Sequence, residues 1–250
     1  MSIVDDLIRS LDTGATPKDI RVGAYWTLVV MERDGKLQAG LSSTLHNDSH
    51  PHKHPPMRAA GSLLERSASE LVDLGRSESL LEASVGMAAI NALLEVDGGG
   101  CTEVNASDII IREGTGRRVA IVGHFPFIAE VREAVEKLWI LELRPQAGDL
   151  PVGRAPEVIP QADVVAITGT ALINHTFGAL VSLCRPDAYV IVLGGSTPLS
   201  PVLFQYGVHA VSGTIVVDIS AVLQAVSQGA TFRQIPGKRL LTMESLVGEE

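Results

Sequence analysis

From Gly114 onward, short runs of apolar residues alternate with helical patterns, and this alternation restricts the fold more than any other feature of the chain. The runs are apolar at every position rather than at every second one, as is typical of strands buried on both faces of a parallel sheet. Strands are predicted at 118–122, 138–143, 164–168, 189–193 and 209–217, with helices at 127–137, 175–184, 201–206 and 219–228. We therefore expect an α/β fold with a Rossmann-like doubly wound parallel sheet.

The first hundred residues follow a different pattern. Residues 21–31 and 37–44, joined by a turn at 32–36, predict a β-hairpin. Helices are expected at 62–74 and 79–94, each opened by a Ser-x-x-Glu capping box, Ser62 with Glu65 and Ser79 with Glu82. We predict a smaller two-layer α+β domain over residues 1–105 and the Rossmann-like domain over 106–250, with the seam between Gly98 and Gly116.

Charge and composition exclude several classes of protein. The chain has 29 acidic residues against 20 Lys and Arg, a net charge of −9 that argues against nucleic-acid binding. No apolar run reaches the roughly 18 residues of a membrane-spanning helix, and residues 1–10 lack the basic and apolar regions of a secretory signal, so a cytoplasmic protein is expected. Cys101 and Cys184 have no metal-ligand spacing and are interpreted as small apolar residues.

Three loops are expected at the carboxyl edge of the parallel sheet, where ligands bind in open α/β folds. They are 123–126 (GHFP), 168–176 (TGTALINHT) and 194–201 (GGSTPLSP), and none contains Asp or Glu. We expect free N–H groups to converge there on one crevice that favours an anion such as a phosphate or carboxylate. The predicted ligand-binding residues of these loops are Gly123, Phe125, Pro126, Thr168, Gly169, Thr170, Asn174, Thr176, Gly194, Gly195, Ser196, Thr197 and Pro198.

Two common site signatures are absent from these loops. Residues 122–127 (VGHFPF) cannot be read as the GxGxxG of dinucleotide-binding folds, which disfavours a conventional NAD-linked dehydrogenase. Ser196 does not stand in a GxSxG elbow, so we assign it a binding role rather than a nucleophilic one. Glu142 lies where a ribose-binding acid would stand, and we interpret it as a solvated strand end.

Imidazoles are the main candidates for chemistry. His124 and His175 fall on the predicted ligand edge, where either could be a general acid or base or a metal ligand. Glu82 either caps its helix or brings a carboxylate to the crevice from the other domain. His46, His50, His52 and His54 lie within nine positions and could hold Zn, Cu, Ni or Fe, although a solvated loop with adventitious metal binding accounts for them as well.

Four ordered motifs resemble those of the heavy-metal chelation family, a group of uncharacterised proteins. They are 119–127 (VAIVGHFPF), 168–176, 194–201 and the helical segment 79–92 (SLLEASVGMAAINA). The resemblance implies an enolase-N-terminal-like domain packed on a Rossmann-like domain, with the active site in the cleft between them. Carried over by position, it adds Glu82, Ser84, Gly86 and Asn91 to the three loops.

The leading expectation is a protein that binds a small anionic molecule or a metal complex in the interdomain cleft, with a role in heavy-metal handling. The first alternative is an enzyme acting on a nucleotide-like or pterin-like substrate, with His124 or His175 and Glu82 as a proton-transfer pair. The second is a non-catalytic regulatory subunit. The sequence defines no cofactor beyond a transition-metal ion that the histidines would suit, and it leaves a homo-oligomer open.

Overall fold

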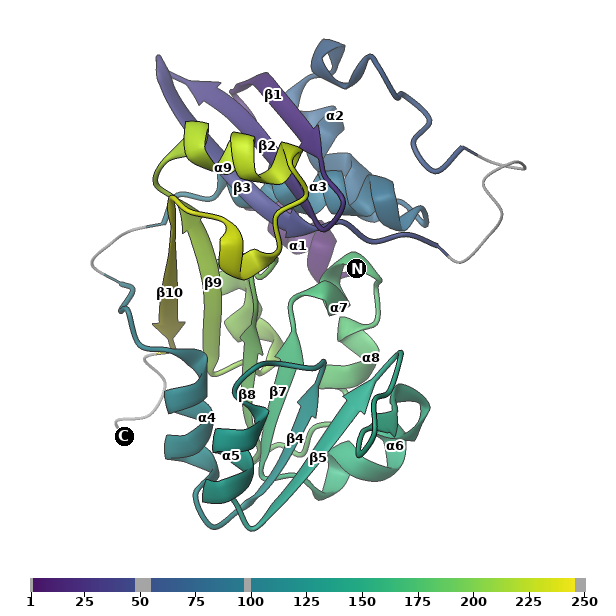
Figure 1. Ribbon diagram of the computed structural model, residues 1–250, viewed down its shortest axis with the longest axis vertical. Helices are drawn as coiled ribbons and strands as arrows, with labels where there is room; N and C mark the ends of the chain where they lie inside the picture. The colour runs from purple at the N-terminus through teal and green to yellow at the C-terminus, as the bar shows by residue number, and fades with distance from the viewer. Residues whose placement is uncertain (1, 48–54, 97–99, 246–250) are drawn as a thin grey trace.

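The molecule consists of two sheets stacked one above the other, each with its own helices (Figure 1). The structure is a computed structural model and describes residues 2–47, 55–96 and 100–245. The upper part, called here the N-terminal unit, contains a three-stranded antiparallel sheet. The lower part, the C-terminal unit, contains a seven-stranded sheet. The mixed α/β fold class predicted from the sequence is confirmed.

The N-terminal unit forms around a meander whose central strand is buried on both faces. Its strands, in spatial order, are β1 (Thr16–Val22), β2 (Trp26–Arg33) and β3 (Lys36–Ser43). The long helix α3 (Leu80–Leu93) packs on one face of this sheet, and α1 (Ile3–Arg9) and α2 (Ala68–Asp73) lie beside it. The predicted hairpin therefore exists, extended by β1, which the sequence prediction missed.

The C-terminal unit is the predicted parallel sheet, with an antiparallel strand added at one edge. Its strands are β4 (Arg118–Val122), β5 (Lys137–Glu142), β6 (Leu150–Pro151), β7 (Val164–Thr168), β8 (Tyr189–Leu193), β9 (Ala210–Val216) and β10 (Lys238–Glu244). The spatial order is β10-β9-β8-β7-β4-β5-β6, and every pair is parallel except β9 with β10. The chain reverses its direction of winding between β4 and β7, so the switch point of the sheet lies there.

Alternate residues of β4 show why its sequence is apolar at every position. Val119 and Ile121 pack on one face with Ile109 and Ile110, whereas Ala120 and Val122 belong to the core on the other face. Both sets are buried because helices cover the sheet on both sides (Figure 1). These helices are α4 (Ala106–Gly114), α5 (Ile128–Ala134), α6 (Ala155–Val158), α7 (Thr170–Ile173) and α8 (Phe177–Val181).

Helix α9 (Ile219–Ser227) crosses from the C-terminal half of the chain to the N-terminal unit. Its Val222 and Val226 pack with Leu28, Val30 and Leu41, on the face of the small sheet opposite α3. Residues 1–105 supply two layers, the small sheet and the helices on one of its faces, and α9 adds a third layer from outside the predicted domain. The run of buried residues in β2 needs cover on both sides, and α9 supplies the second cover.

Six short 3-10 helices complete the described chain. They are η1 (Leu63–Glu65), η2 (Leu74–Arg76), η3 (Val152–Arg154), η4 (Ile159–Gln161), η5 (Pro201–Tyr206) and η6 (Phe232–Gln234). No helix within the described residues is long and apolar enough to cross a membrane.

Both predicted capping boxes were wrong. Ser62 makes no side-chain cap bond, and the box that opens α2 is formed by Ser67 and Glu70 instead. The hydroxyl of Ser79 donates to the carbonyl of Pro56, and Glu82 accepts hydrogen bonds from Arg58. A guanidinium and a carboxylate are both ionised and here form two bonds, a stronger interaction than a single bond from a cap N–H, which accounts for the difference at Glu82.

Candidate functional site

The turns after β4, β7 and β8 lie together at the carboxyl edge of the large sheet. Gly123 and Gly194 directly follow β4 and β8, and their φ angles of +107° and +116° belong to a conformation that side-chain-bearing residues rarely adopt. The N–H groups of Gly123, Gly169 and Gly194 each donate to a carbonyl of a neighbouring strand, at 2.8–3.1 Å. These bonds fix each turn to a neighbouring strand, and they leave these three amides unavailable to a ligand.

The turns form one wall of a cavity of about 530 Å³ between the two units. We call it the larger cavity, because a smaller one adjoins it. The N-terminal unit supplies Trp26 and Ser43 to the lining, the start of α4 supplies residues 104–107, and η6 supplies Phe232 and Arg233. The predicted loop residues that line this cavity are His124, Phe125, Pro126, Thr168, Gly169, Thr170, Gly194, Gly195 and Ser196. Most of the three predicted loops therefore meet at one site.

Aromatic rings form much of the wall of the larger cavity. Phe125 stacks on Phe127 with ring centroids 5.2 Å apart, and the ring centroids of Trp26 and Phe232 are 4.8 Å apart. Gly195 permits this approach, because a Cβ there would stand 2.5 Å from Phe232 and 2.7 Å from Trp26. The chain has only ten aromatic residues, and four of them meet here, so the cavity suits a flat, apolar group.

The electrostatics of the larger cavity favour an anion. No Asp or Glu is among its described lining residues, although the chain has 29. Arg233 is exposed at its wall and has no ion-pair or hydrogen-bond partner within the described part of the chain. The backbone N–H groups of Gly195 and Ser196 are likewise without a described partner. A carboxylate or phosphate could therefore find both a positive charge and amide donors.

A smaller cavity of about 220 Å³ adjoins the larger one at the switch point between β4 and β7. The two share His124, Phe125, Thr168 and Thr170 in their linings. Among the predicted residues, the smaller cavity adds Gly123, Asn174 and Thr176, and its wall also includes Glu142. A ligand that fills both cavities would pass His124.

His124 has a carboxylate partner that the sequence did not reveal. Its Nδ1 lies 3.1 Å from Oδ2 of Asp149, which also accepts a bond from the N–H of Gln146 at 3.0 Å. Asp149 comes seven residues after β5, in the turn that leads to β6. The sequence did offer one indication of this contact. Asp149 lies in the loop after the predicted strand next to β4, and the loops that follow parallel strands meet at the same edge of the sheet.

Ser196 and Asn91 join the two units rather than projecting into open space. The Oγ of Ser196 accepts from the N–H of Ser43 at 2.8 Å and donates to the Oγ of Ser43 at 3.0 Å. The amide nitrogen of Asn91 donates to the carbonyls of Leu41 and Ser196, at 2.8 and 3.1 Å. These bonds hold the turn after β8 against the end of β3 and so fix one wall of the larger cavity.

Several predicted site residues line neither cavity. From the loops these are His175, Thr197 and Pro198, and from the N-terminal unit they are Glu82, Ser84, Gly86 and Asn91, which lie within the packing of α3. The Nε2 of His175 donates to the carbonyl of Ser77 at 2.9 Å, which ties the loop after β7 to the N-terminal unit. In the described part of the chain, no hydrogen bond joins Glu82 to His124 or to His175, the two histidines that the sequence suggested as its proton-transfer partners.

Glu82 belongs to an ion pair at the start of α3. Its side chain is 1% exposed, and it accepts from the Nε and Nη2 of Arg58 at 3.0 and 2.7 Å and from the hydroxyl of Ser77 at 2.6 Å. Burial would raise the pKa of the Glu82 carboxyl, but the hydrogen bonds from Arg58 and Ser77 outweigh it and lower the pKa to about 2. The carboxylate is therefore held ionised, and both of its oxygens accept hydrogen bonds from Arg58 or Ser77.

The structure offers little for a bare metal ion. Within residues 2–47, 55–96 and 100–245, no three His, Cys, Asp or Glu side chains are grouped so as to hold one. His46 is exposed, and His50, His52 and His54 lie outside the described residues. Burial raises the pKa of the Cys184 thiol to about 11, so the thiolate form that metals bind is disfavoured.

Two stacked sheets with a cavity between them define a mixed α/β protein built from two units. The chain belongs to the DUF364 family, whose model, described as "Putative heavy-metal chelation", matches residues 105–244. A second model with the same description, DUF4213, matches residues 4–94. The family resemblance expected from the sequence is confirmed.

Two solved structures share this fold, and a further relative matches in sequence. A DUF364 protein of unknown function from Desulfitobacterium hafniense has a crystal structure that is 24% identical, covers 97% of this chain and 98% of its own, and gives a TM-score of 0.81. One from Pyrococcus horikoshii is 20% identical, with coverage of 97% and 98% and a TM-score of 0.82. An uncharacterised protein of Methanocaldococcus jannaschii is 23% identical over 217 residues, 82% of this chain and 80% of the relative.

Proposed function

We propose that this protein binds a small organic anion that carries a flat ring, in the larger cavity between the two units. The observation that carries the proposal is the composition of the cavity wall, which combines four aromatic side chains with Arg233 and, among its described residues, contains no acid. The ring would lie among the aromatic residues, and its carboxylate or phosphate would face Arg233 and the amides of Gly195 and Ser196.

The family description suggests a role with heavy metals, and the cavity limits the form that such a role takes. His124 is the one common metal ligand among the described lining residues, so these side chains cannot complete a coordination shell. We propose that any metal enters this cavity as a complex with an organic chelator. The chelator, rather than the protein, would supply most of the ligands.

Isothermal titration with defined probes tests the proposal. The probes are phenylpyruvate, pterin-6-carboxylate and adenosine monophosphate, compared with zinc and nickel ions alone. We expect micromolar binding of at least one ring-bearing anion. Binding of the bare ions together with no binding of any anion would contradict the proposal and favour chelation by the protein itself.

Replacing Arg233 should weaken anion binding without affecting the fold. We expect Arg233→Gln to raise the Kd of the bound anion about 10-fold, because one charge-assisted hydrogen bond is lost at a partly hydrated position. Arg132→Gln is the matched control: Arg132 is exposed on α5, lies outside both cavities and loses the same charge. Equal Kd values in the two variants would remove Arg233 from the binding site.

A further inference from the structure

The hydrogen bond between His124 and Asp149 fixes the tautomer of the imidazole. A carboxylate only accepts hydrogen bonds, so Nδ1 must carry the proton that it shares with Asp149. In the neutral ring, Nε2 then holds the free electron pair, and no described residue donates to it. An imidazole arranged in this way is a base whose active atom is defined in advance.

The two partners differ in their access to solvent. The side chain of Asp149 is 4% exposed, whereas that of His124 is 37% exposed and lines both cavities. The N–H of Gln146 also donates to the same carboxylate oxygen, which holds it in place. Asp149 is therefore buried and lines neither cavity, so it acts on a ligand through His124.

Two hydroxyls share the junction of the cavities with His124. Thr168 and Thr170 line both cavities, and their Oγ1 atoms lie 3.0 Å apart. Only one of their two protons is needed for the bond between them, so the other is available to an oxygen atom of a ligand. The junction thus combines a base with a hydroxyl donor that can stabilise a developing oxyanion.

We propose that His124 is a catalytic base that moves a proton on the bound anion, with Asp149 as its positioning residue. The inference rests on the proposed function, because the anion must first occupy the larger cavity. The substrate class is a ring-bearing anion with an acidic C–H bond next to a carbonyl group. Nε2 takes the proton from carbon, the electron pair of the C–H bond forms a C=C bond, and the π pair of the carbonyl moves to its oxygen to give an enolate. The imidazolium then returns a proton, to oxygen to form the enol or to carbon to restore the ketone, and this regenerates the neutral base.

Phenylpyruvate is a suitable probe because it has a ring, a carboxylate and a CH₂ group beside a carbonyl. In D₂O, proton removal followed by return of deuterium replaces the CH₂ hydrogens, and ¹H NMR follows their loss. We expect the wild-type protein to accelerate the exchange with saturation, and His124→Ala to lower kcat at least about 100-fold. Titration calorimetry of phenylpyruvate, run on the same samples, measures binding separately.

The Asp149→Asn variant tests whether Asp149 positions the imidazole of His124 or only supports the fold around it. We expect kcat to fall about 10- to 100-fold with KM and the calorimetric Kd unchanged, because the amide no longer imposes the tautomer while the cavity remains. Asp187→Asn, at an exposed acid outside both cavities, is the matched control and should exchange at the wild-type rate.

The outcomes distinguish this inference from the proposed function. Binding of phenylpyruvate with exchange no faster than in His124→Ala would overturn the inference and leave the binding function standing. An Asp149→Asn variant with wild-type kcat, or with kcat and KM changed together, would remove the positioning role. No binding of phenylpyruvate by the wild-type protein would overturn the inference for this substrate class, while binding of pterin-6-carboxylate or adenosine monophosphate would leave the binding function standing. No binding of any of the three anions would count against both.

Discussion

Gly86→Ala is expected to destabilise the protein by at least about 3 kcal/mol, the largest effect of any single change on the fold that we predict. A Cβ at this position would collide with the backbone N of Gly75 and stand 2.5 Å from its Cα. These are backbone atoms, which cannot rotate away as a flexible side chain can. Helix α3 would have to move off η2, and the contacts of Leu74 and Val85 in the core would loosen with it.

Urea unfolding measures this effect, and Gly178→Ala provides the control. Gly178 lies in α8, and nothing stands within 4 Å of the Cβ that alanine would add. There the substitution should be neutral or stabilising by up to about 1 kcal/mol, because alanine loses less backbone entropy in a helix. A Gly86→Ala variant within about 1 kcal/mol of the wild type would show that α3 and η2 are not so closely packed.

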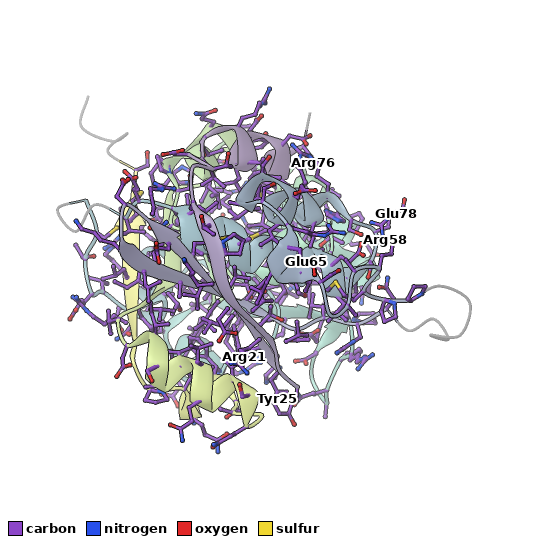
Figure 2. The ribbon with its side chains drawn as sticks, turned by 90° about the horizontal axis from the view of Figure 1, so that it is seen from above. Arg21, Tyr25, Arg58, Glu65, Arg76 and Glu78 are labelled. Atoms are coloured by element: carbon purple, nitrogen blue, oxygen red, sulfur yellow. The ribbon has the colours of Figure 1, made fainter. Side chains whose placement is uncertain are left out.

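Glu82→Gln should destabilise the protein by about 2 kcal/mol at pH 7. The substitution keeps the shape of the side chain but removes the charge that faces Arg58. The cost is smaller than for a fully buried pair, because the guanidinium of Arg58 is 70% exposed and hydrates readily. Figure 2 shows Arg58 at the periphery of the molecule.

The effect of Glu82→Gln should depend on pH in a defined direction. The folded-state pKa of Glu82, about 2, lies below its ordinary value of 4.5, so the contribution is fully present above pH 4.5 and lost as the pH falls toward 2. At pH 3 the stability difference from the wild type should be less than half its value at pH 7. Glu65→Gln, at an exposed acid, is the control and should show no difference at either pH.

The central strands of the large sheet were predictable from the sequence because a short run that is apolar at every position is typical of a strand buried on both faces. Strands β4, β7 and β8 begin and end where the pattern placed them. Strand β10 was missed because its residues, KRLLTME, mix charged and apolar side chains, as suits an edge strand with partial exposure. Helix α4 was missed because it lies inside the stretch that was interpreted as a seam.

The candidate site was only partly predictable. The order of the strands in the sheet places some of its residues, whereas the others reach it through long-range packing and an irregular turn. Residues that follow parallel strands could be assigned to one edge by topology alone, and the lining of the two cavities agrees with that placement. Phe232 and Arg233 reach the larger cavity only because α9 crosses to the other unit, which no local pattern indicates. Asp149 meets His124 across 25 positions of chain, through a turn whose path the sequence does not specify.

Because α9 crosses to the N-terminal unit, segments cannot be exchanged freely between relatives at the boundary of the two family models. That boundary falls between residues 94 and 105, which makes it a convenient junction for chimeras. Yet Leu28 and Leu41 pack against Val222 and Val226, far beyond that junction. A hybrid that takes its first ninety or so residues from another member must therefore take α9 from the same parent, because the two segments form one inseparable interface.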